Sequence, residues 1–135
     1  MKKFLLFILC IMLVLSTISC SSYVSSYKAL ILVREEHSDH GSIRFSKLEG
    51  RYVMKLKMSG KGQEGDILCN ASLDEGEINV YYDWLGTKEL LFNLKGGESI
   101  NERRGYVESG HTVYIIIETV TPAKEGKISI DFRKS

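Results

Sequence analysis

Apolar and polar side chains alternate with a period of two along much of this 135-residue chain. The clearest example is the segment 51–59, where one set of alternating positions is apolar and the other includes lysines. The apolar set is Tyr52, Met54, Leu56 and Met58. Successive side chains of a β-strand point to opposite faces, so this pattern predicts a strand with one face in a core and the other in water.

Segments of this kind recur at intervals of roughly 8–12 residues, separated by turns rich in glycine. We expect Tyr27–Glu35, a very apolar segment, to be a central strand; a helix over 29–36 is the alternative. Asp74-Glu75-Gly76 is expected to turn a hairpin, the last two strands should pair as a second hairpin, and Asn101–Arg104 should be a solvated loop. The expected strands are 27–35, 42–48, 51–59, 66–73, 77–83, 87–94, 111–120 and 127–133.

This spacing predicts an all-β domain over 27–135, built as an antiparallel two-sheet β-sandwich that is Ig-like or jelly-roll-like in topology. A closed lipocalin-like barrel is the alternative. About 115 residues follow position 20, which is enough for one domain with a modest core.

The first nineteen residues have the three parts of a secretory signal peptide. Lys2 and Lys3 form a positive start, Phe4–Leu15 is apolar, and the following residues are mostly small. The apolar run holds about a dozen residues, whereas a spanning helix needs roughly 20. We therefore expect the protein to be exported, with an uncleaved membrane anchor as the alternative.

Thr17-Ile18-Ser19-Cys20 ends this leader and resembles a bacterial lipobox, although the commonest pattern has Leu in place of Thr17. The resemblance implies that Cys20 receives a diacylglyceryl group on its sulfur and becomes the first residue of the mature chain. The organisation would then be a signal peptide over 1–19, a lipidated Cys20 with a tether over 20–26, and the domain over 27–135. Ordinary cleavage after Ser19 is the alternative.

A lipid anchor at Cys20 would hold the domain close to the cell membrane or the outer membrane, because six extended tether residues reach about 20 Å. Without Lys2 and Lys3, sixteen basic side chains accompany seventeen acidic ones, well mixed along the chain. Such a near-neutral surface does not favour nucleic acid. We expect the membrane as one partner and an envelope protein or glycan as another. Cys69, the only other thiol after processing, is expected to be a buried apolar residue.

Glu35 to His40 is a cluster of side chains that can bind metals. His37, Asp39 and His40 are the candidate ligands for Zn²⁺ or Cu²⁺, with His111 as a residue that could join them in the fold. The alternative is a charged loop between strands.

Tyr81, Asp83 and Trp84 form a second candidate site at a strand end. Aromatic rings beside a carboxylate suit the recognition of a sugar or a peptide, because the rings supply stacking area and Asp83 supplies an acceptor. The alternative is that Trp84 fills the end of the sandwich.

Motifs for catalysis are absent from the sequence: it has no Gly-x-Ser-x-Gly elbow, no phosphate loop and no His-Glu-x-x-His. Its carboxylates fall at exposed turns, which does not favour glycosidase chemistry. We therefore predict a membrane-anchored, non-catalytic binding or structural module of the cell envelope without a cofactor. A small-ligand (carbohydrate or metal) binding protein is the first alternative, and a small envelope enzyme is the second.

Overall fold

The structure is a computed structural model that describes residues 23–135, and this part of the chain is built from antiparallel strands. The strands are β1 (Ser26–Glu36), β2 (His40–Lys57), β3 (Glu64–Asp83), β4 (Glu89–Lys95), β5 (Ser99–Glu108) and β6 (Thr112–Lys134). They form one sheet in the order β1-β2-β6-β3-β4, with β5 also paired to β3. Residues 23–135 contain no helix long and apolar enough to cross a membrane. The helical alternative for 29–36 is wrong, because these residues lie in β1.

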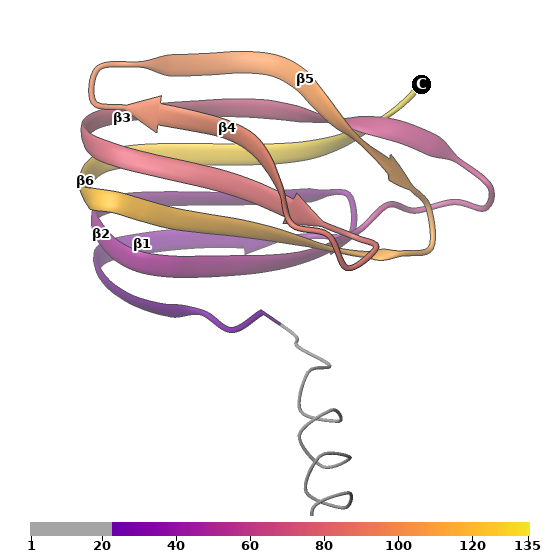
Figure 1. The fold of residues 1–135 in the computed structure, drawn as a ribbon, viewed down its shortest axis with the longest axis horizontal. Coiled ribbons are helices and arrows are strands. Elements are labelled where there is room, and N and C mark those ends of the chain that lie inside the picture. Colours follow the sequence, from indigo (N-terminus) through magenta and orange to yellow (C-terminus); the bar gives the residue numbers. More distant parts are fainter. Residues whose placement is uncertain (1–22) are drawn as a thin grey trace, which may run out of the picture.

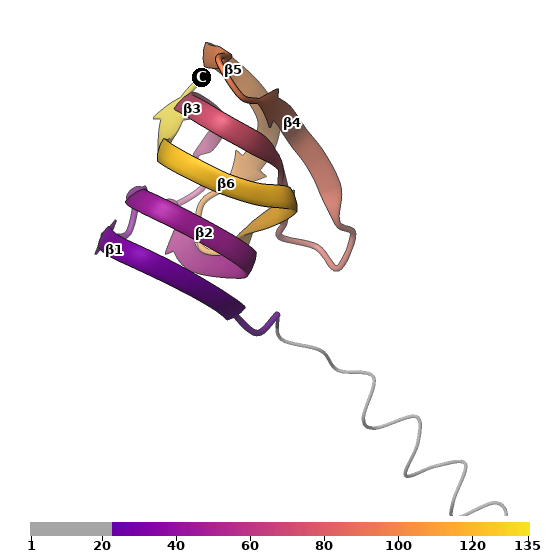
Figure 2. The same cartoon turned by 90° about the vertical axis from the view of Figure 1, so that its left-hand side faces the viewer.

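The three longest strands, β2, β3 and β6, bend near their middles and fold this sheet into two layers (Figures 1 and 2). Pairing is irregular at two of these places, between Leu48 and Arg51 and between Glu75 and Glu77. We call the two layers A and B. Layer A contains β1, β5, and residues 40–48, 64–73 and 123–134; layer B contains β4 and residues 51–57, 77–83 and 112–121.

Gly76 shows why the chain can bend so sharply in β3. Its φ of 94° lies in the left-handed region, which residues with a side chain rarely adopt. A Cβ there would overlap the carbonyl oxygen of Pro122 and lie 2.8 Å from the Cα of Ala123 in β6. The bends of β3 and β6 are therefore in backbone contact, and only glycine fits between them.

Both hairpin predictions are wrong, because the expected turns are bends inside long strands. Residues 74–76 bend β3 from layer A into layer B, and residues 121–126 lie within the continuous strand β6. The halves of each strand pair with neighbouring strands instead of with each other. The predicted loop at Asn101–Arg104 is also wrong, since it pairs with β3 as part of β5. Tyr27–Glu35 is not a central strand, because β1 is at one end of the sheet order.

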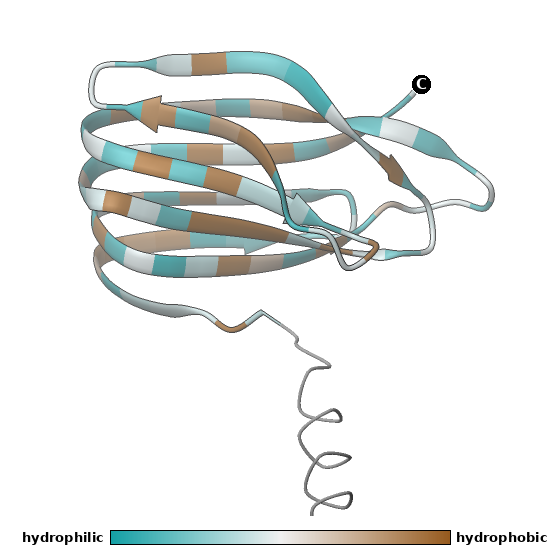
Figure 3. Cartoon of the chain, in the orientation of Figure 1, coloured by the Kyte–Doolittle hydropathy of each residue, from teal (hydrophilic) through white to brown (hydrophobic). Residues whose placement is uncertain are grey.

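The predicted core faces are confirmed. Inward-facing residues from both layers form one buried cluster, and polar residues alternate with them along the strands (Figure 3). The cluster includes Tyr52, Met54, Leu56, Met58, Ile78, Val80, Tyr82, Ile128, Ile130 and Phe132. The chain is thus an all-β antiparallel β-sandwich, as the sequence predicts, and the sheet remains open because β1 and β4 end its order.

Candidate functional site

Asp83, the last residue of β3, joins three parts of the molecule in layer B. Its side chain is only 4% exposed, although it carries a carboxylate. The Tyr23 hydroxyl donates a hydrogen bond of 2.6 Å to Oδ2, and the Gly86 N–H donates one of 2.7 Å to Oδ1. Buried carboxylates need such partners, because an unpaired buried charge is costly. One carboxylate therefore fastens both the start of the described chain and the loop 84–88.

The segment 23–25 lies against layer B. The Tyr23 ring is 5.4 Å from the Tyr114 ring of β6, and the Val53 N–H of β2 donates a 2.9 Å hydrogen bond to Ser25 Oγ. The hydrogen bond to Asp83, together with some burial, raises the pKa of Tyr23 to about 12. Within the predicted tether over 20–26, residues 23–25 are therefore docked on the domain, and Ser26 is the first residue of β1.

Trp84 follows Asp83 and packs, partly buried, against the end of the core. Its ring meets Tyr106 of β5 and His111 edge-on, with centroid distances of 5.8 and 5.1 Å. The next residue, Leu85, is 66% exposed. This end of the sandwich therefore combines a packed aromatic group with an apolar side chain in solvent.

The three residues predicted to bind a ligand are neighbours in sequence but have different surroundings. Tyr81 faces outward on layer B, where the Lys88 Nζ lies 4.2 Å from its ring centroid. Both carboxylate oxygens of Asp83 accept hydrogen bonds within the chain. Trp84 packs toward β5 rather than beside Tyr81. Their joint role in ligand binding stays a prediction, and the Asp83 carboxylate already has two donors.

The predicted metal-binding loop has hydrogen bonds of its own. Asp39 accepts two 2.7 Å hydrogen bonds, from the N–H and the hydroxyl of Ser59. His40 Nδ1 lies 2.7 Å from Asp131 Oδ1, and the rings of His37 and His40 stack at 6.4 Å. Within residues 23–135, no group of three or more His, Cys, Asp or Glu side chains is placed to hold a metal ion. Metal binding by His37, Asp39 and His40 stays a prediction, and His111 packs on Trp84 instead.

Of the two cysteines predicted to remain after processing, the structure describes Cys69 alone. Cys69 is fully buried in the core, as predicted, and this burial raises the pKa of its thiol to about 12. Such a thiol is almost entirely protonated at neutral pH and is a poor nucleophile. Cys20 lies outside the described residues, so its lipidation stays a prediction.

The free edge of β1 is a surface that the sequence did not reveal. Within residues 23–135, β1 pairs with β2 alone. Leu30, Ile31 and Val33 are 56%, 77% and 50% exposed. Ile31 has a φ of 50°, in the left-handed region that is rare for a β-branched residue. An edge with exposed apolar side chains is a pairing surface for other chains.

The left-handed residue explains why so many apolar side chains of β1 face outward. Ala29 and Leu32 are three residues apart, yet both pack against the core. In a regular strand they would point to opposite faces. The turn at Ile31 shifts the alternation by one residue, so Leu30 and Val33 both reach solvent. No local sequence signal marks this shift.

A pocket of about 200 Å³ lies beside the first half of β1. Ala29, Leu48 and Ala123 contribute apolar surface to it from β1, β2 and β6. Lys28, Lys47, Lys124 and Glu49 also line it. The pocket therefore combines an apolar surface with three positive charges and one negative charge. Its residues come from β1, β2 and the distant β6, which is why the sequence pattern could not group them.

Comparisons with known proteins assign no family to this chain. No family model and no curated protein matches it. Among solved structures it is similar to a family 29 carbohydrate-binding module complexed with mannohexaose, at 13% identity and a TM-score of 0.40, covering 82% of this chain and 90% of that one. Another family 29 module is similar at 15% identity and a TM-score of 0.41, covering 82% of this chain and 75% of that one. The chain is also similar to the cupin domain of Drosophila melanogaster CENP-C, at 17% identity and a TM-score of 0.31, covering 84% of this chain and 73% of that one.

Proposed function

We propose that this protein is a membrane-anchored lipoprotein of the cell envelope, and that its sandwich binds an extended segment of another protein along β1 without catalysing a reaction. The anchor rests on the lipobox-like cysteine at position 20. The binding role rests on one observation, the exposed apolar edge formed by Leu30, Ile31 and Val33.

Strand addition is the recognition mode that fits this edge. An incoming strand would pair its backbone with the free side of β1, and alternate side chains would contact Leu30 and Val33. Natural proteins protect such edges with charges and irregular backbone. β1 has both, in Lys28, Arg34 and the left-handed Ile31. These features restrict unspecific pairing but leave the apolar side chains in solvent, which favours a chosen partner over general aggregation.

The neighbouring pocket indicates what the partner segment contains. Its apolar lining would accept one small or medium apolar side chain. Lys124 is paired with Glu75 at 3.5 Å. The three lysines around the pocket still outnumber its one carboxylate, Glu49, and would favour acidic residues next to that side chain, because complementary charges guide association. The proposed partner is therefore a protein with an extended segment in which an apolar residue is flanked by Asp or Glu.

The anchor is tested by the intact mass of protein extracted from membranes, measured beside a Cys20→Ala variant. We expect a chain that starts at Cys20 and carries acyl chains, and we expect the variant to lose them. A soluble chain that starts at Cys20 without lipid would refute the anchor.

The binding surface is tested by placing a photo-crosslinking amino acid at Leu30 and, as a matched control, at Leu90 of β4. Both leucines are 56% exposed. We expect Leu30 to give a protein adduct of constant mass in cells and Leu90 to give none. A second substitution, Val33→Lys, should remove the adduct while the circular dichroism spectrum stays unchanged. Equal labelling at the two leucines, or an adduct that survives Val33→Lys, would contradict the proposal.

A further inference from the structure

We infer that the segment 23–25 and the loop 84–88 form the surface that lies on the phospholipid bilayer, with Val24 and Leu85 in the headgroup region. This inference rests on the proposed acylation of Cys20. It adds an orientation, because acylation alone would leave the domain free to present any side to the membrane.

The distance along the chain limits that freedom. Cys20 precedes Tyr23 by three residues, and three residues reach about 10 Å even when fully extended. Tyr23 is hydrogen-bonded to Asp83, and its ring lies against that of Tyr114. Whatever path the intervening residues take, an acylated Cys20 must therefore stay within about 10 Å of the Asp83 end of layer B.

The side chains at this end suit a lipid surface. Val24 is 69% exposed and Leu85 66%. Trp84 precedes Leu85 in the chain and forms an edge-on aromatic pair with Tyr106. Tryptophan and tyrosine are enriched where a protein meets the membrane interface, because their rings are apolar at one end and polar at the other.

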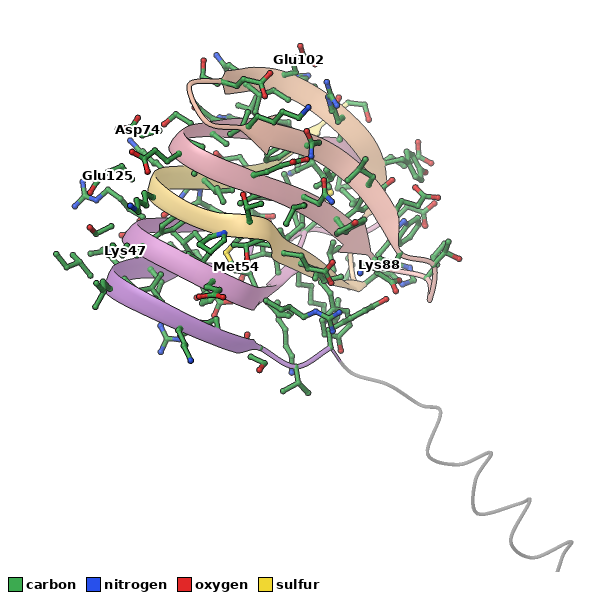
Figure 4. All side chains as sticks on the ribbon, turned by 60° about the vertical axis from the view of Figure 1, so that its left-hand side comes forward. Lys47, Met54, Asp74, Lys88, Glu102 and Glu125 are labelled. Atoms are coloured by element: carbon green, nitrogen blue, oxygen red, sulfur yellow. The ribbon has the colours of Figure 1, made fainter. Side chains whose placement is uncertain are left out.

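The shared carboxylate makes the two segments one unit. Asp83 holds Tyr23 through Oδ2 and Gly86 through Oδ1, so the anchored segment and the loop cannot move apart without breaking a buried hydrogen bond. In Figure 4, Lys88 lies near the place where the described chain begins, whereas Asp74 and Glu125 lie at the bends of the long strands, at the opposite end. The charged bends would then point away from the bilayer.

β1 stays accessible in this orientation. In Figure 2, β1 and β4 lie on opposite sides of the point where the described chain begins. The loop 84–88 connects β3 to β4 and lies on the β4 side. A bilayer in contact with this loop therefore leaves the free edge of β1 open to a protein partner.

The experiment uses the acylated full protein in vesicles of phosphatidylethanolamine and phosphatidylglycerol, with part of the lipid brominated near the headgroup. Bromine quenches tryptophan fluorescence only at short range, and Trp84 is the single tryptophan. The matched control is Trp84→Phe combined with Asp74→Trp, which moves the probe to the exposed bends. We expect Trp84 to lose a large part of its fluorescence, as a side chain at the headgroup level should, and the probe at position 74 to lose little.

The possible results separate the two proposals. The intact mass of the same sample reports acylation, so a chain without lipid refutes the anchor itself. If the chain is acylated but Trp84 is not quenched, or the probe at 74 is quenched equally, the orientation is wrong and the anchor stands. Tyr23→Phe provides a second test: without its hydroxyl the tie to Asp83 is lost, and the difference between the two probes should shrink. An unchanged difference would refute the role of Tyr23 in setting the orientation.

Discussion

Replacing Gly76 with alanine tests the bend on which the two-layer fold depends. The φ of 94° is unfavourable for alanine by roughly 1–2 kcal/mol. The new Cβ would also overlap the Pro122 carbonyl and lie 2.8 Å from the Cα of Ala123. These are backbone atoms of β6, which cannot move aside as a flexible side chain can. Overpacking of this kind costs roughly 1–3 kcal/mol more.

The expected total loss for Gly76→Ala is therefore about 2–5 kcal/mol, a large part of the roughly 5–15 kcal/mol that holds a domain folded. Gly97→Ala is a matched control. Gly97 has a similar φ of 88°, but a Cβ there meets nothing within 4 Å. It should lose only the backbone cost of about 1–2 kcal/mol.

Urea unfolding of the protein, followed by circular dichroism, measures both losses as shifts of the midpoint at a constant slope. The difference between the two variants isolates the contact between β3 and β6. If both variants lose the same stability to within about 0.5 kcal/mol, the bends do not press on each other and the reasoning is refuted.

Three further predictions concern titratable groups. Burial opposes the charge of Glu118, but hydrogen bonds from Lys88 and Arg51 outweigh it and lower the pKa of Glu118 below 4.5. Its stabilisation is therefore present above pH 4.5 and lost as the pH falls through the folded value, so Glu118→Gln should flatten the acid side of a stability–pH curve. The pKa of Tyr23 is raised from 10.0 to about 12, so its stabilisation is present below pH 10.0 and lost as the pH rises toward 12. Urea midpoints measured across this pH range should fall for the unchanged protein, and Tyr23→Phe should remove this part of the fall. Cys69, with its thiol pKa raised to about 12 by burial, should react with iodoacetamide only in urea, and an alkylated Cys69 peptide from the native protein would contradict this.

The buried faces of the strands could be predicted because the information is local. In the segment 51–59, each apolar residue is two positions from the next, and the sheet turns all of them inward. The same holds for Ile128, Ile130 and Phe132 in β6. Any antiparallel sandwich needs this alternation, so the fold class follows without knowledge of which strands are partners.

The bends could not be predicted, because a bend and a hairpin turn use the same local chemistry. Asp74-Glu75-Gly76 supplies polar residues and a left-handed glycine, as a tight turn does. What decides between them is that β3 continues to pair with β6 on both sides of Gly76. Those partner residues are about 40–60 positions away in the sequence, beyond the range of a turn pattern.

The side-chain partners in the candidate sites could not be predicted either, because they too are distant in sequence. Asp83 beside aromatic residues is typical of a ligand acceptor, but its hydrogen-bond donor Tyr23 is sixty positions earlier in the chain. The sequence places Tyr23 in a polar tether and gives no sign that it returns to β3. The chemistry of Asp83 therefore predicts an acceptor, and only the fold shows that the chain itself supplies the hydrogen-bond donors.

The position of β1 at the edge of the sheet does not explain its amino-acid composition. An edge strand needs no run of exposed apolar side chains, and glycine would adopt the left-handed conformation at position 31 without the cost that isoleucine bears. Strain of this kind persists where it serves another purpose, and the side effect here is that Leu30 and Val33 both face outward. A sequence typical of a central strand is thus found at an edge, and the proposed partner segment would make it a central strand. The mismatch between pattern and position is therefore a physical reason to look for the partner at β1.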